Sequence, residues 1–109
     1  MKIREKQAKR IQSWMGIEEY NNKVELINEL IQYKRIKIPV KWFKKNDPEI
    51  LETINANNYI LLIFYENRVR WNPDGIEPFP IHEDTWEDWF ENDAPIEKYV
   101  KYIKENQYK

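Results

Sequence analysis

Residues 82–93 hold the densest cluster of side chains that could do chemistry. Carboxylates alternate there with large aromatic rings, and His82, the only histidine of the chain, opens the segment. If the segment is helical, the rings at positions 86, 89 and 90 share one face, the spacing of a helix docked on a core. The alternative leaves them exposed as anchors for a protein partner with a basic surface. The candidate partner-binding residues are Glu83, Asp84, Trp86, Glu87, Asp88, Trp89, Phe90 and Glu91.

The scarce residue types exclude most catalytic and cofactor sites. The chain has no cysteine, which removes thiolate nucleophiles, iron–sulfur clusters and zinc sites with sulfur ligands. It has two glycines, too few for a loop that cradles phosphates. His82 stands among flexible carboxylates without a recognisable metal-ligand spacing, and nothing indicates a cleft between paired acids. We therefore expect a non-enzymatic protein with no metal and no cofactor.

Charge is segregated along the chain, although the net charge is only -1. Residues 1–45 carry a net charge of +7, whereas residues 71–97 carry nine acidic side chains and neither lysine nor arginine. Two outcomes follow. The carboxylates project outward as one acidic patch, or the opening helices neutralise them within the molecule. The hypothesis of a basic protein partner depends on the first outcome.

The basic side chains support a second hypothesis, nucleic-acid binding through phosphate contacts. The order of the expected elements is compatible with a winged helix in which a hairpin forms the wing. The helix in the recognition position is acidic, however, and has no lysine or arginine, which suits a phosphate-lined groove poorly. We therefore rank nucleic acid second. Its candidate residues are Lys2, Arg4, Lys6, Lys9, Arg10, Arg68 and Arg70.

Two helices are expected in the first third of the chain. Apolar residues at helical spacing among lysines and arginines predict a helix over 2–15, which Gly16 ends with a left-handed turn. A wider apolar stripe with three- and four-residue steps predicts a second helix over 18–34.

Apolar residues then recur at every second position, which predicts a strand over 36–42 with its lysines on one face. Pro39 and those lysines favour an edge strand, because they discourage pairing with another chain. Asp47 followed by Pro48 is typical of a helix start, so a short helix is expected over 48–57.

Residues 59–65 (YILLIFY) predict the central strand of the sheet. They are apolar at every position, as a strand covered on both faces would be. A two-residue break then predicts a hairpin with a strand over 68–71. Asn72-Pro73-Asp74-Gly75 predicts a type I turn, and the prolines that follow predict an extended connector up to Ile81.

The last quarter of the chain is expected to be helical. Thr85 with Asp88 three residues later resembles a capping box, which would open a short helix. A final helix is expected over 95–106, with its apolar residues facing inward.

Together these elements predict a single α+β domain over residues 1–109. Two N-terminal helices, a small, mainly antiparallel three-stranded sheet (36–42, 59–65, 68–71) with an intervening helix, and two C-terminal helices make up the fold. The direction of strand 36–42 stays open.

Location and origin are also suggested by composition. No run approaches the roughly 18 apolar residues of a membrane span, and the first residues lack an apolar signal-peptide core, so we expect a cytoplasmic protein with no membrane partner. Lys, Asn, Ile and Tyr make up 46 of the 109 residues, a bias typical of AT-rich genomes. A small inhibitor or accessory factor from a low-GC bacterium or its phages is the expected context.

Overall fold

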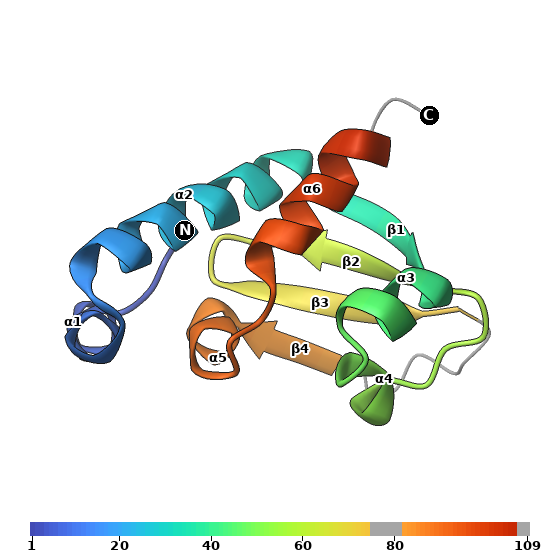
Figure 1. Ribbon diagram of the computed structural model, residues 1–109, viewed down its shortest axis with the longest axis horizontal. Helices are drawn as coiled ribbons and strands as arrows, with labels where there is room; N and C mark the ends of the chain where they lie inside the picture. Colours follow the sequence, from blue (N-terminus) through green and yellow to red (C-terminus); the bar gives the residue numbers. More distant parts are fainter. Residues whose placement is uncertain (75–81, 107–109) are drawn as a thin grey trace.

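A four-stranded antiparallel sheet forms the centre of the molecule (Figure 1). The computed structural model describes residues 1–74 and 82–106. Each strand pairs with the next one along the chain, so the sheet is a meander in which β1 and β4 are the edges. The strands are β1 (Arg35–Pro39), β2 (Tyr59–Phe64), β3 (Arg68–Pro73) and β4 (His82–Thr85). The predicted α+β class is confirmed, with four strands instead of three.

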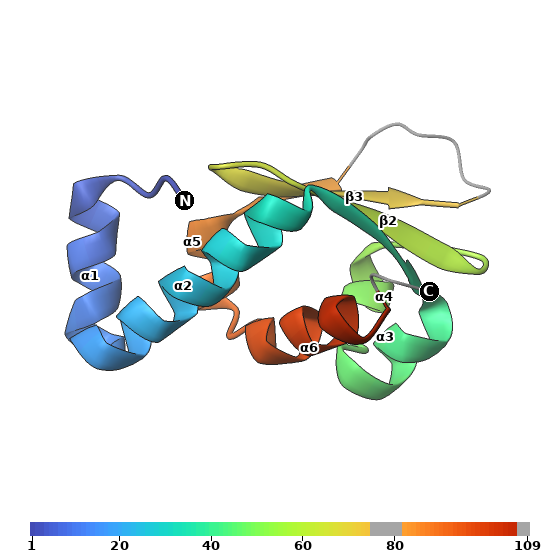
Figure 2. The same cartoon turned by 90° about the horizontal axis from the view of Figure 1, so that it is seen from above.

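Six helices belong to the described ranges, and they lie on one side of the sheet (Figure 2). They are α1 (Glu5–Met15), α2 (Ile17–Tyr33), α3 (Val40–Asn46), α4 (Ile50–Thr53), α5 (Trp86–Glu91) and α6 (Ile96–Asn106). The expectation that β2 is covered on both faces is therefore wrong for the described part of the chain. None of these helices combines the length and the apolar character that crossing a bilayer requires.

Gly16 separates the first two helices, as predicted. Its φ of 92° lies in the range that only glycine adopts readily, so α1 ends and α2 begins at once in a new direction. The helices begin at Glu5 and Ile17, against the predicted starts at residues 2 and 18.

The strand predicted over 36–42 ends at Pro39, and the next residues form α3. Pro39 is extended and serves as the N-cap of this helix. Because proline has no backbone N–H, strand pairing can stop at this residue without leaving an unpaired hydrogen-bond donor. Trp42 therefore lies on a helix and does not continue the face of Ile36 and Ile38. The edge position of β1 is confirmed, and its pairing with β2 is antiparallel.

The helix predicted over 48–57 shrinks to the single turn of α4. Asp74 explains much of the difference, because its carboxylate accepts hydrogen bonds from the backbone N–H groups of Asn57, Asn58 and Tyr59. These N–H groups bond to Asp74 at the start of β2, so they are not available for the hydrogen bonds of a longer helix. The bond from Tyr59 is the main cause that lowers the pKa of Asp74.

Strand β4 was not predicted. It is polar and four residues long, and it pairs with β3 so that Glu83 lies opposite Arg70. The connector expected up to Ile81 lies outside the described residues, as does Gly75 of the predicted turn; Asn72 and Pro73 belong to β3.

The capping box at the start of α5 is confirmed. Thr85 Oγ1 accepts from the Asp88 N–H at 3.1 Å, and Asp88 Oδ2 accepts from the Thr85 N–H at 2.9 Å. Helix α6 follows within a residue of its predicted start and buries the apolar side chains Ile96, Tyr99 and Ile103.

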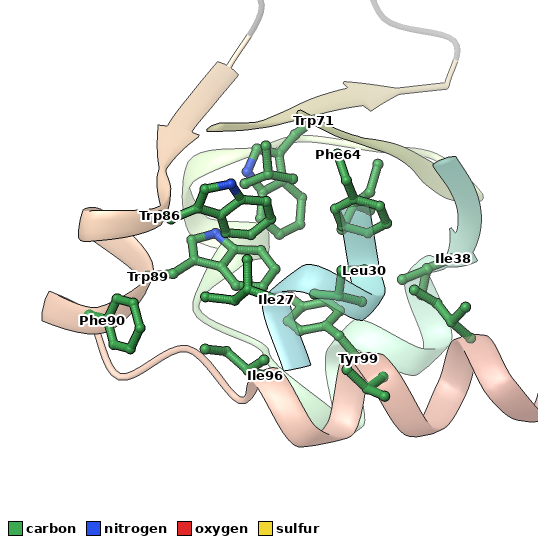
Figure 3. Packing of buried hydrophobic residues seen from close by; sticks show 14 of the residues in the cluster. Ile27, Leu30, Ile38, Phe64, Trp71, Trp86, Trp89, Phe90, Ile96 and Tyr99 are labelled. Atoms are coloured by element: carbon green, nitrogen blue, oxygen red, sulfur yellow. The ribbon is translucent and has the colours of Figure 1, made fainter. Parts of the chain in front are cut away.

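The core fills the space between the inner face of the sheet and the helices (Figure 3). Aromatic rings dominate it: Trp86 meets Trp89 edge-on with centroids 5.0 Å apart, and Trp71 lies 6.0 Å from Trp89. Each strand alternates between this buried face and an outer one; in β2 the buried residues are Ile60, Leu62 and Phe64. This alternation decides which side chains are available for function.

Candidate functional site

The three aromatic residues proposed as partner anchors belong to the core. Trp86, Trp89 and Phe90 are 0%, 3% and 2% exposed, and Figure 3 shows them pointing from α5 into the packed interior. Trp86 also donates its Nε1–H to the backbone oxygen of Tyr65 at 2.9 Å. The buried interpretation is confirmed, and in this structure the rings cannot serve as exposed anchors.

Each carboxylate proposed for partner binding has a partner within the molecule. Glu87 faces Arg4, the residue before α1, at 4.0 Å, and Glu91 pairs with Arg10 of α1. Asp84 accepts from Trp71 Nε1 at 3.0 Å. Asp88 is occupied by the capping box described above. Glu83, Glu87 and Glu91 thus pair with arginines, whereas Asp84 and Asp88 hydrogen-bond with neutral groups of Trp71 and Thr85. The acidic segment is therefore neutralised in part within the molecule.

His82 and Asp84 are neighbours, with Nε2 and Oδ2 3.2 Å apart. Because the same carboxylate oxygen already accepts from Trp71, the pair is tied into the sheet. Within residues 1–74 and 82–106, no three histidine, aspartate or glutamate side chains gather as a metal-binding group would require.

Four of the five N-terminal cations proposed for nucleic-acid binding are paired as well. Besides Arg4 and Arg10, Lys2 lies 3.6 Å from Glu66 and Lys9 lies 3.4 Å from Glu5. Lys6 is exposed on α1. Helix α1, which carries Lys6, Lys9 and Arg10, stands beyond the end of the sheet on its helical side (Figure 2). Lys2 and Arg4 precede this helix, and Lys2 binds Glu66, in the turn before Arg68, through its backbone N–H and its side chain. The predicted nucleic-acid residues therefore extend from α1 to the β2–β3 turn, and Arg68 and Arg70 are the ones that stand on the sheet.

Arg68 and Arg70 lie on the face of the sheet that no described helix covers, which we call the outer face. The strand register brings other side chains beside them. Arg35, Ile63, Arg70 and Glu83 form one row across all four strands, and Lys37, Leu61 and Asn72 form the next. Tyr65 and Tyr59 flank these rows at the two ends of β2.

Positive charge dominates the outer face. Four cations, Arg35, Lys37, Arg68 and Arg70, stand on its strands with a single carboxylate, Glu83. Arg70 binds Glu83 through Nε at 2.9 Å and a terminal nitrogen at 2.7 Å, and Arg68 Nε lies 3.3 Å from the same carboxylate. The bond from Arg70 is the main cause that lowers the pKa of Glu83. Across the described chain, Arg35 and Lys37 form no ion pair.

Each of the two tyrosine rings has a cation against it. Lys37 Nζ lies 4.8 Å from the centroid of Tyr59, and the Arg68 guanidinium lies 4.4 Å from the centroid of Tyr65. Both rings are partly exposed. Tyr65 is six positions after Tyr59, and a strand rises about 3.3 Å per residue, so the two residues stand about 20 Å apart along the sheet. The outer face therefore combines aromatic surfaces with positive charge over an extended track.

From the sequence, Arg35 and Lys37 are among the basic residues that could contact phosphates, and Arg68 and Arg70 are expected on one face of the hairpin. The sequence did not show that these cations share a face, and Tyr59 and Tyr65 were missed as their companions. The two-residue alternation in 35–39 and 59–65 carried the necessary signal. This signal was hard to use because residues 59–65 are apolar on both faces, so both faces of the strand were expected to be buried.

Comparisons with known proteins assign no family to the chain. A scan against protein-family models found no matching family, and searches of curated proteins and of solved structures found no match.

Proposed function

We propose that the protein binds single-stranded nucleic acid along the outer face of its sheet. The observation that carries the proposal is the collection of four cations and two tyrosine rings on that face, in a chain whose net charge is -1. Phosphates attract such cations, and bases stack on aromatic rings regardless of sequence. Each ring has its own cation, so a base and its neighbouring phosphate can be engaged together.

A single strand fits this surface better than a duplex does. A duplex is commonly read by a helix in the major groove, and α4, which stands where a recognition helix was expected, has four residues and no lysine or arginine. An open four-stranded sheet with aromatic side chains is a form that proteins use to splay and stack unpaired bases.

The proposal reverses the order of the two hypotheses drawn from sequence. A basic protein partner needs exposed carboxylates and exposed rings between residues 82 and 93. Three of the carboxylates there, Glu83, Glu87 and Glu91, pair with arginines of the chain, and the rings are buried. Among the described residues, Glu83 is the one carboxylate that pairs with cations of the outer face, and it pairs with Arg68 and Arg70.

Fluorescence anisotropy with labelled 15-mers of deoxythymidine and uridine tests the proposal. Binding should weaken as salt is raised from ~50 to ~200 mM, with a logarithmic slope of about -2 to -3, as expected when three or four phosphates of a single strand are neutralised. Absence of binding at ~50 mM salt, or binding that ignores salt, would contradict it. An acidic protein docking on the same face would appear as no oligonucleotide binding at all.

A pair of matched variants places the binding on the sheet. Arg35→Ala/Lys37→Ala removes two cations that form no ion pair within the described chain, and it should flatten the salt slope by about 1.4. Lys6→Ala/Lys9→Ala removes the same charge from the exposed surface of α1 and should leave the slope unchanged. Equal effects of the two variants would show that only net charge matters.

A further inference from the structure

A second, separate feature lies on the helical side of the molecule. A cleft of about 610 Å³ opens between α3 and α6. Its volume is within the usual range for small-ligand sites. Figure 2 shows both helices on the side of the sheet opposite the outer face. The cleft therefore opens on the helical side of the molecule, although Pro39 at the end of β1 also lines it.

Lysines dominate the rim of this cleft. Lys41 and Lys45 come from α3, and Lys98 and Lys101 come from α6, with Glu105 as the only acid that lines it among the described residues. None of the four lysines forms an ion pair with a described carboxylate. Four ammonium groups around one hollow repel one another, and a multiply charged anion would relieve that repulsion.

The walls of the cleft are aromatic and well supported. Trp42 and Tyr102 line it, with ring centroids 5.6 Å apart, and Trp42 also packs against Tyr99 at 4.9 Å. The Tyr99 hydroxyl donates to Asp47 Oδ2 at 2.5 Å, which joins α6 to the residue after α3. Burial of Tyr99 and the neighbouring Asp47 charge raise the pKa of its hydroxyl, so Tyr99 stays a donor at physiological pH. The two walls are thereby held at a fixed separation.

We propose that the α3–α6 cleft is a binding site for a small anion that carries a diphosphate or triphosphate group. Such a group presents several negative oxygens, which match lysines from two facing helices. The ligand is either a free polyphosphate or a nucleotide. If it is a nucleotide, its base also contacts Trp42 or Tyr102. The site acts independently of nucleic-acid binding on the outer face.

Isothermal titration with three probes in magnesium-free buffer tests this site. Pyrophosphate and ADP should both bind, and adenosine should not; tighter binding of ADP would identify a nucleotide, and equal binding a free polyphosphate. In parallel, both ligands should shift the NMR signal of the Trp42 indole N–H. Failure of both phosphates to bind at millimolar concentration, or adenosine binding as well as ADP, would overturn the proposal.

Variants locate that binding in the cleft. Lys41→Ala/Lys101→Ala removes one exposed lysine from each wall and should weaken pyrophosphate binding roughly fivefold to thirtyfold. Lys6→Ala/Lys9→Ala should bind pyrophosphate like the unmodified protein, since α1 does not line the cleft. If both double variants bind pyrophosphate as the parent does, the lysines of the cleft are not the site.

Discussion

Replacing Trp86 by alanine should lower the free energy of unfolding by about 3–5 kcal/mol. The ring is fully buried, packs edge-on against Trp89 and stacks with Phe64 at a centroid distance of 6.3 Å. Its loss leaves a large cavity and also removes the donor to the Tyr65 carbonyl. Urea denaturation followed by circular dichroism measures the change.

Trp14 provides the matched control for this substitution. It is 51% exposed at the end of α1, so Trp14→Ala should change stability by no more than about 0.5 kcal/mol. Similar small effects at both positions would mean that Trp86 lies outside the core. The hypothesis that it anchors a protein partner would then return.

Replacing either tyrosine of the outer face by leucine should weaken oligonucleotide binding by about 1–3 kcal/mol, or roughly 5- to 150-fold. Leucine keeps apolar bulk on a partly buried strand but offers no flat ring on which a base can stack. Tyr59→Leu and Tyr65→Leu test the two ends of the track separately. Anisotropy at one fixed, low salt concentration gives the affinities.

Phenylalanine at the same positions is the control. Tyr59→Phe and Tyr65→Phe preserve the ring, so affinity should stay within about twofold of the parent, because stacking needs no hydroxyl. If phenylalanine and leucine weaken binding equally, base stacking on these rings is not part of the interaction.

Sequence predicted well those elements whose signals are local. The apolar stripe of α2, the two-residue break of the β2–β3 hairpin and the capping residues of α5 act within a few positions of one another. The turn at Gly16 is likewise predictable, because glycine readily adopts a positive φ. Such features hardly depend on what the rest of the chain does, so pattern and propensity suffice for them.

The missed elements depend on distant partners. Strand β4 has no apolar alternation of its own. It forms because its backbone pairs with β3 and because Glu83 binds two arginines of that strand. The loss of the helix expected over 48–57 requires Asp74, which reaches back from the end of β3 to Asn57 and Asn58. Neither interaction is visible in a short window of sequence.

At the candidate site, too, sequence alone could not predict which charged residues are neutralised within the molecule. Segregation into a basic and an acidic segment was evident, but two opposite outcomes were compatible with it. The pairs Arg4–Glu87 and Arg10–Glu91 join the N-terminal segment to α5 and favour neutralisation within the molecule. On the sheet, strand pairing creates one face that carries Arg35 and Lys37 of β1, which form no ion pair with a described residue, beside two arginines of β3 that share Glu83.

Amide chemical-shift mapping of the ¹⁵N-labelled protein during titration with a deoxythymidine 15-mer distinguishes the outer face from the other surfaces of the protein. We expect the largest shifts on β1, β2 and β3, around Lys37, Leu61 and Arg70, while α1 and α5 stay unchanged. Shifts concentrated on α1 or α5, or within the α3–α6 cleft, would contradict binding by the outer face.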